Sequence, residues 1–131
     1  VLDLIGRDTL KEYLAMLGKA ALLVPPDSGP MHIATAMGTP VLGLHAASNP
    51  QRSGPYLSRR WCVDRYDDAA RKFLGKPAEA LKWGTKLEFP GVMELVSEDD
   101  ARERLDAFVA AGMPRSGVPC PTANPPPGAS P

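Results

Sequence analysis

The stretch Ala21–His32, with the sequence ALLVPPDSGPMH, predicts a strand, a tight turn and the start of a helix. The first four residues are apolar and typical of a buried strand, and Pro25-Pro26 is expected to end it because proline cannot donate to a sheet ladder. Pro30 suits the first position of a helix, which we expect to continue to Met37 and to stop at Gly38. Polar chemistry is therefore expected in the turn before the helix.

The start of this helix is suited to binding an anion. A helix N-terminus exposes unpaired N–H groups and about half a positive elementary charge. Ser28 and Gly29 are the residues whose backbone and hydroxyl would reach a phosphate there. Asp27 would repel a phosphate, so it is better suited to accept hydrogen bonds from sugar hydroxyls or to cap the helix. An ordinary N-cap at Asp27 or Ser28 explains these residues equally well, and both interpretations stay open.

Composition restricts the class of protein. The 131 residues are 44% hydrophobic, which is enough for one core. Lys and Arg number 15 and so do Asp and Glu, so no basic surface points to nucleic acid. The sequence has no apolar run of bilayer length and no signal-peptide pattern. Cys62 and Cys120 lie far apart, which favours free thiols in a cytoplasmic protein.

Helices and strands are predicted to alternate along the first half of the chain. Thr9–Glu12 has the form of a capping box and opens a helix to about Lys19. Its apolar stripe, expected to cover a sheet, consists of Leu10, Tyr13, Leu14 and Leu17. Thr39–Leu44 is a second buried strand. This order predicts an α/β fold with a doubly wound parallel sheet, whose ligands would lie at the carboxyl ends of the strands near Asp27 and His45.

The second half continues the pattern with shorter elements. Trp61–Asp64 is predicted as a last short strand, Arg65–Leu74 as a helix and Pro77–Lys82 as a helical turn. Trp83 is expected to pack in the core, because large aromatic side chains usually do.

A final helix is predicted after the capped, acidic turn Ser97–Asp100. Its expected buried face consists of Ala101, Leu105, Phe108 and Val109. We therefore predict one domain over residues 1–110. Residues 111–131 are rich in Pro, Gly, Ser and Ala, and are expected to form a disordered tail because too little is apolar to offset the ordering entropy.

Other chemistry is less strongly indicated. His32 lies one turn into the predicted helix, where its ring either points back toward a phosphate or packs between helix and sheet. His45 lies near the same face, but no third ligand is spaced to complete a metal site. The carboxylate pairs Asp67-Asp68 and Asp99-Asp100 are expected to be caps and solvated charges. Gly-x-Gly-x-x-Gly is absent, which disfavours a dinucleotide-binding enzyme.

The loop His45–Tyr56 is long and polar. A loop of this length within a compact domain is either functional or a flexible surface crossing, and both interpretations stay open.

Three segments together carry a family resemblance. Asp27–Ala34, Met37–Val41 and Asn49–Tyr56 resemble the C-terminal domain of glycosyltransferase family 9, the lipopolysaccharide heptosyltransferases. The similarity extends from about Gly6 to Val109. Members of this family have the GT-B fold, in which two Rossmann-like domains face a cleft. They transfer a heptose from an ADP-sugar to the lipopolysaccharide core without a metal ion or other cofactor. The resemblance thus implies the C-terminal, Rossmann-like half of a GT-B glycosyltransferase.

The resemblance also implies roles for individual residues. Asp27 matches the aspartate that contacts the donor sugar, and Ser28 and Gly29 match the pair that binds the diphosphate. Met31 and His32 complete this donor-binding motif. A loop expected to border the donor site contributes Ser48, Asn49, Arg52 and Gly54. The chain departs from many relatives at two places. It has His45-Ala46-Ala47 where Gly-Pro is common after the strand, and Pro25 where the strand usually ends in a less rigid residue.

The family's N-terminal domain, which binds the acceptor and supplies the general base, has no counterpart in this sequence. We therefore expect a donor-domain fragment with no catalytic residue of its own, which binds ADP weakly and does not turn over. The resemblance implies a cytoplasmic protein whose full-length form associates peripherally with the inner membrane. A non-catalytic nucleotide-binding or interaction module of the same fold remains the alternative.

Overall fold

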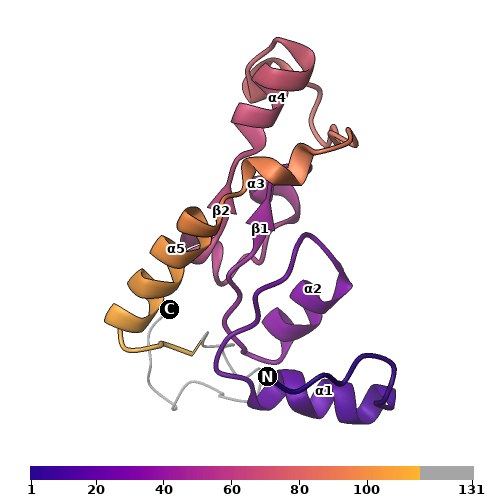
Figure 1. Cartoon of the computed structure of the whole chain (residues 1–131), viewed down its shortest axis with the longest axis vertical. Helices are drawn as coiled ribbons and strands as arrows, with labels where there is room; N and C mark the ends of the chain where they lie inside the picture. The colour runs from indigo at the N-terminus through magenta and orange to yellow at the C-terminus, as the bar shows by residue number, and fades with distance from the viewer. Residues whose placement is uncertain (116–131) are drawn as a thin grey trace, which may run out of the picture.

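A computed structural model of the chain describes residues 1–115 and shows an α/β arrangement, with a small parallel sheet between helices (Figure 1). The expected tail at 111–131 lies outside the described residues from 116 onward. The elements are α1 (Leu10–Lys19), α2 (Gly29–Ala36), β1 (Leu44–His45), α3 (Pro50–Ser53), η1 (Arg59–Trp61), β2 (Val63–Asp64), α4 (Tyr66–Leu74), η2 (Ala78–Ala80), η3 (Val92–Leu95) and α5 (Glu98–Ala110).

Three extended segments run parallel in the centre of the molecule. β1 pairs with β2 in the register Leu44 to Val63, and isolated bridges join Leu23 to Val41 and Pro26 to Leu44. The order in space is therefore the segment around residues 23–26, then β1, then β2. The carboxyl ends of all three segments lie on the same side, as the sequence pattern predicted for the first two.

The prediction that Pro25-Pro26 ends the first strand is wrong. The Leu44 amide donates a 2.9 Å hydrogen bond to the Pro25 carbonyl, and Pro26 forms a bridge with Leu44. Proline lacks an N–H group but keeps its carbonyl, so an edge segment can accept hydrogen bonds through proline. The strand pairing therefore reaches to the residue before Asp27.

The first two helices begin and end close to where the sequence predicted. Thr9 and Glu12 form a capping box at the start of α1, and Gly38 adopts a φ of 76° directly after the end of α2. The two helices contact each other, and the Thr39 hydroxyl donates to the Leu17 carbonyl at 2.5 Å. Of the predicted stripe only Leu17 is buried, and Leu10 is 71% exposed. The apolar stripe is thus buried at the C-terminal end of α1, where α1 contacts α2.

In the second half of the chain, the predicted helices and strand are confirmed, but the predicted burial of Trp83 is not. α4 and η2 match the predicted helix and turn, and β2 matches the last part of the predicted strand. Trp83, however, is 68% exposed. The core of this half contains instead Leu87 and, packed against it, the stacked rings of Phe73 and Phe89, whose centroids are 5.0 Å apart.

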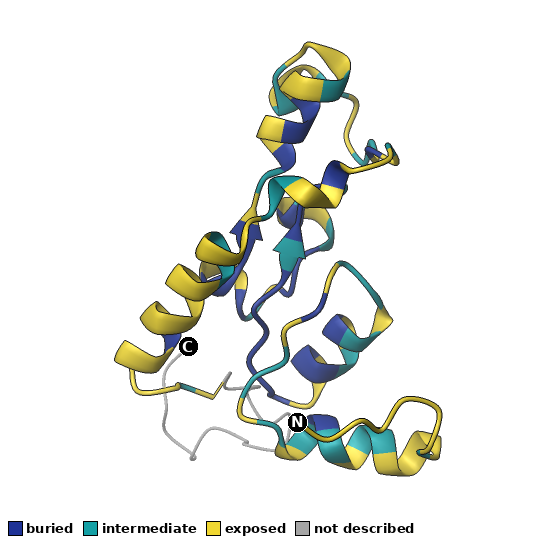
Figure 2. Ribbon diagram, in the orientation of Figure 1, coloured by how far each residue is buried: buried dark blue, intermediate teal, exposed yellow. Residues whose placement is uncertain are grey.

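The buried face of the last helix, α5, contains fewer side chains than predicted. The predicted cap at Ser97 is confirmed, and the structure extends it to a capping box between Ser97 and Asp100. Phe108 is fully buried and meets the Trp61 ring edge-to-face with centroids 5.3 Å apart. Leu105 and Val109 are 41% and 53% exposed, which corrects their predicted burial. Figure 2 shows α5 as a largely exposed helix, and its main contacts are with η1 and β2.

Candidate functional site

Asp27 follows the first parallel segment directly and lies at the carboxyl ends of the strands. Its Oδ2 accepts a 2.9 Å hydrogen bond from the Ser53 hydroxyl. Partial burial raises the pKa of Asp27, but hydrogen bonds from Ser48 and Ser53, together with the nearby His45 and His32, outweigh it and hold the pKa below its usual value. Asp27 is therefore ionised at neutral pH and is held by the loop that follows β1.

The start of α2 lies beside Asp27 and has no side-chain cap. Ser28 occupies the N-cap position, yet its hydroxyl donates to the Pro26 carbonyl at 3.2 Å and makes no bond to the helix. Pro30 at the start of the helix has no N–H group to satisfy. The ordinary-cap interpretation of Asp27 and Ser28 thus finds no side-chain hydrogen bond among the described residues.

The other predicted residues of this motif are placed in different environments. Gly29 and His32 are exposed on the first turn of α2, so the packed position considered for His32 is not observed. Met31 is fully buried against Ala34 and Val41. Only the backbone of Met31 lies near the predicted site, and its amide donates to the Ser28 carbonyl at 3.2 Å.

The polar loop after β1 contains the short helix α3, which was not predicted from the sequence. Asn49 caps α3 by accepting a 2.9 Å hydrogen bond from the Gln51 amide, and Pro50 opens the helix. The Gly54 amide donates to the Pro50 carbonyl at 2.9 Å, and a Cβ at Gly54 would collide with that oxygen. Asn49 and Gly54 therefore shape the loop.

Arg52 is exposed on α3 and lies over Gly84. A Cβ at Gly84, whose φ is 87°, would come within 3.0 Å of Arg52 Nε. This contact joins the loop after β1 to the segment before Leu87.

Ser48 and His45 form the inner part of the site. Ser48 is almost fully buried, and its hydroxyl lies 3.3 Å from Nδ1 of the fully buried His45. Burial lowers the pKa of His45, against the opposing effect of Asp27 and Asp64, so the ring is neutral at neutral pH. The structure thus brings Asp27, His45, Ser48 and Ser53 together.

Two of these residues were not among the predicted site residues. Ser53 lies one helical turn after Asn49 in α3, and the Asn49-Pro50 start signal was the feature that would have placed it there. His45 was expected near the ligand-binding edge of the sheet and was considered as a metal ligand, but no role was predicted for it beside Asp27. Ser48 is only three residues away, but Asp27 and Asp64 come from the neighbouring segments of the sheet, which no local pattern reveals.

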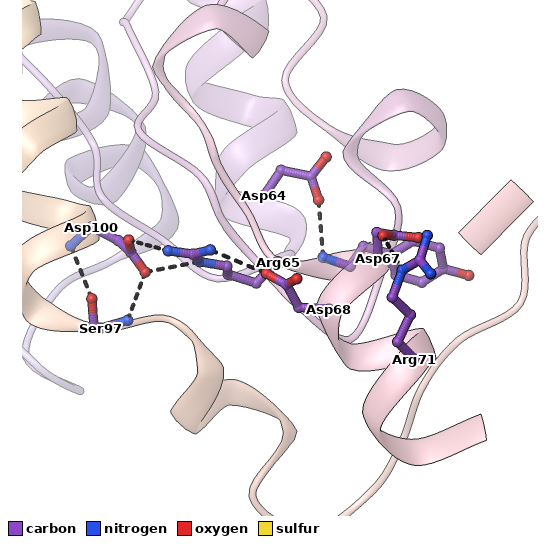
Figure 3. Close-up of polar contacts among 8 residues, drawn as sticks. Asp64, Arg65, Asp67, Asp68, Arg71, Ser97 and Asp100 are labelled. Carbon is purple, nitrogen blue, oxygen red and sulfur yellow. Dashed lines mark hydrogen bonds and ion pairs between the residues drawn. The ribbon is translucent and has the colours of Figure 1, made fainter. Parts of the chain in front are cut away.

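Of the two carboxylate pairs, Asp67, Asp68 and Asp100 are engaged in ion pairs, and Asp100 also bonds to Ser97 at the start of α5 (Figure 3). Arg65 binds Asp100 and Asp68, with a 3.0 Å bond from its Nε to Asp100 and a 3.1 Å bond to Asp68. Asp67 binds Arg71 at 2.7 Å. This arrangement agrees with the prediction that these residues are caps and surface charges.

Within residues 1–115, no three His, Cys, Asp or Glu side chains gather as metal ligands, and no helix is long and apolar enough to cross a membrane. Cys62 is buried as a free thiol, and Cys120 lies outside the described residues.

Comparison with known proteins identifies the family. The sequence profile described as glycosyltransferase family 9 (heptosyltransferase) matches residues 1–83. The chain is 44% identical over 91 residues to the lipopolysaccharide core heptosyltransferase OpsX of Haemophilus influenzae, an alignment that covers 70% of this chain and 26% of that protein. The chain thus spans about a quarter of this relative's length. No solved structure gave a significant match. The chain therefore belongs to glycosyltransferase family 9, the heptosyltransferase family.

Proposed function

We propose that this chain is the donor-binding part of a heptosyltransferase that moves a heptose from an ADP-sugar to a lipopolysaccharide core acceptor. Family membership and the similarity to a core heptosyltransferase support the reaction class. One structural observation carries the donor assignment: the ionised Asp27 lies beside the uncapped start of α2, at the carboxyl ends of three parallel segments. Ligands of open α/β sheets bind at this edge.

In this proposal the two halves of the donor contact different groups. The diphosphate lies at the start of α2, where Ser28, Gly29 and the helix charge stabilise it without a dedicated basic residue. Asp27 would repel the phosphates, so it accepts hydrogen bonds from the sugar hydroxyls instead. His32, exposed on the same turn, borders the diphosphate.

The chemistry follows from this placement. Departure of ADP from the anomeric carbon develops negative charge on the diphosphate, and the positive end of α2 stabilises that charge in the role that a divalent cation has in other transferases. The acceptor and the general base are assigned to a second domain of a GT-B enzyme, opposite the donor site. We place the full protein in the cytoplasm, at the face of the inner membrane where a lipid-linked acceptor is presented.

Calorimetric titration of the full-length protein with ADP and with ADP-heptose tests the donor assignment. Asp27→Asn should weaken ADP-heptose binding about 10- to 100-fold, the effect of one charge-assisted hydrogen bond, and leave ADP binding nearly unchanged. Asp99→Asn, which removes an exposed carboxylate on α5, serves as the control. Equal losses for both ligands in Asp27→Asn would contradict the assignment to the sugar.

A transfer assay with ADP-heptose and a lipopolysaccharide-core acceptor tests the reaction itself. The full-length protein should transfer the sugar, whereas the 131-residue chain should not. Binding of ADP by the full-length protein without any transfer would instead favour the non-catalytic nucleotide-binding module.

A further inference from the structure

We propose that His45 is a positioning residue for Asp27 and acts through Ser48. The three side chains form a hydrogen-bonded series, His45–Ser48–Asp27, that leads from the interior of the sheet to the donor site. This inference rests on the assignment of Asp27 to the donor sugar proposed above. It adds a residue from β1 that does not itself reach the ligand.

His45 is a polar ring buried at the end of the sheet. The side chain is fully buried at the end of β1, and Nε2 has no hydrogen-bond partner among the described residues. Its ring lies over Gly43, where a Cβ would come within 2.7 Å of Nε2. Burying an imidazole is unfavourable unless its polar atoms are used, and the contact that His45 makes is the 3.3 Å one between Nδ1 and Ser48 Oγ.

Because Asp27 can only accept hydrogen bonds, it determines which atom donates and which accepts in each bond of the series. An ionised carboxylate only accepts hydrogen bonds, and a serine hydroxyl has a single proton to donate. Ser48 gives Asp27 a hydrogen bond that lowers the pKa of the carboxylate, so the Ser48 proton points to Asp27, and Ser53 donates to Asp27 Oδ2 at 2.9 Å. The Ser48 oxygen must then accept from His45. His45 therefore carries its proton on Nδ1, and Nε2 is a buried lone pair with no N–H left unpaired.

The series fixes the orientation of the Asp27 carboxylate from inside the protein. Ser53 lies on α3 and is half-buried, whereas Ser48 and His45 are shielded from water. A hydroxyl held by the buried ring has less freedom to turn away from Asp27 than a hydroxyl bonded to water. His45 thus sets the direction of Ser48, and Ser48 holds the carboxylate toward the sugar.

Nitrogen-15 NMR of the histidine rings in the ligand-free, full-length protein tests the direction of the series. Chemical shifts distinguish a protonated from an unprotonated ring nitrogen, and His45→Asn assigns the signal by its loss. We expect a proton on Nδ1 and none on Nε2 at pH 7. A proton on Nε2, or on both nitrogens, would overturn the proposal. This result does not depend on which donor the protein binds.

A double-mutant cycle tests whether His45 acts through Ser48. His45→Phe keeps a ring but removes the donor, Ser48→Ala removes the hydroxyl, and His45→Asn restores an N–H near the position of Nδ1. The pKa of Asp27, followed by carbon-13 NMR of its carboxyl group, should rise in His45→Phe and in Ser48→Ala. The double variant His45→Phe/Ser48→Ala should raise the pKa of Asp27 no more than Ser48→Ala alone does. In His45→Asn this pKa should stay close to the wild-type value.

The same variants should weaken ADP-heptose binding about three- to tenfold while ADP binding stays constant. An unchanged pKa of Asp27 in His45→Phe, or additive effects in the pair, would overturn the role of His45. Absence of ADP-heptose binding in the wild type, with the expected tautomer and pKa changes, would refute the proposed donor and leave the positioning role intact.

Discussion

The Ser53 hydroxyl donates a 2.9 Å hydrogen bond to the Asp27 carboxylate, which joins two residues that are 26 positions apart. Ser53 is the last residue of α3, and Asp27 lies in the turn before α2. The bond therefore connects the loops that follow two neighbouring parallel segments. It also keeps the loop after β1 close to the proposed donor site.

Removing this hydroxyl should make donor binding more sensitive to acid. Ser53 stabilises the ionised form of Asp27, so Ser53→Ala should raise the pKa of Asp27 toward its usual value. ADP-heptose binding by the full-length protein, measured by calorimetry from pH 7 downward, should then be lost at a higher pH than in the wild type. At pH 7 we expect a loss of about threefold to tenfold.

The matched control for this experiment is Ser53→Thr, which keeps the hydroxyl. Its acid profile should follow that of the wild type, because Thr can donate the same bond. Identical acid profiles for Ser53→Ala and the wild type would show that the Ser53 bond does not contribute to the ionisation of Asp27.

The two N-cap positions of α1 and α2 should respond differently to the same substitution. Thr9 is engaged in a capping box, with its hydroxyl accepting from the Glu12 amide and Glu12 accepting from the Thr9 amide. Thr9→Ala should therefore lower the free energy of unfolding by about 1 kcal/mol. Ser28→Ala should lower it by less than about 0.5 kcal/mol, because Ser28 makes no side-chain bond to α2.

Urea denaturation of the full-length variants measures this difference, and ADP binding provides the second measurement. Ser28→Ala should weaken ADP binding, whereas Thr9→Ala should not. A stability loss at Ser28 as large as that at Thr9 would restore the interpretation of Ser28 as an ordinary cap.

Features determined by neighbouring residues were predictable from the sequence. The capping box Thr9–Glu12 predicted the start of α1, the capped acidic turn Ser97–Asp100 predicted the start of α5, and Gly38 predicted the end of α2. Each signal depends on hydrogen bonds or backbone angles within one turn of chain. The alternation of helices and strands was predictable for a similar reason, since apolar periodicity is local.

Features determined by partners distant in sequence were not predictable. The ladder through Pro25 depends on the Leu44 amide, and the bond to Asp27 depends on where α3 places Ser53. Leu105 and Val109 have the spacing of a wide buried stripe, yet the narrow contact of α5 with η1 and β2 leaves them exposed. The sequence thus indicated that the loop after β1 lies near Asp27, but not that Ser53 of this loop would bind the Asp27 carboxylate.

The ion pair between Arg65 and Asp100 should contribute to stability only above acidic pH. The Arg65 hydrogen bond, followed by the Ser97 amide, lowers the pKa of Asp100 from 3.8 to about 2. A depressed pKa means that the contribution is complete above the unfolded-state value and is lost as the pH falls toward 2. Asp100→Asn should therefore destabilise by about 0.5 to 1 kcal/mol at pH 7, since solvent screens this partly exposed pair, and by less near pH 2.

Asp99→Asn is the matched control for this pair. It removes a neighbouring carboxylate from the same first turn of α5, and Asp99 makes no ion pair among the described residues. Urea denaturation at pH 7 and near pH 2 compares the two variants. A pH-independent difference between Asp100→Asn and the wild type would show that the Arg65 contact does not depend on the charge of Asp100.

Phe108 should anchor α5, and Leu105 on the same helix should not. The Phe108 ring is fully buried and meets Trp61 edge-to-face, so Phe108→Ala removes a core ring and an aromatic pair and should cost about 3 to 5 kcal/mol. Leu105→Ala removes a side chain that is 41% exposed and should cost less than about 1 kcal/mol. Hydrogen–deuterium exchange of α5 peptides in the full-length protein reports this locally. Exchange should accelerate strongly in Phe108→Ala and little in Leu105→Ala, and equal acceleration would mean that the face of α5 bearing Leu105 is also packed.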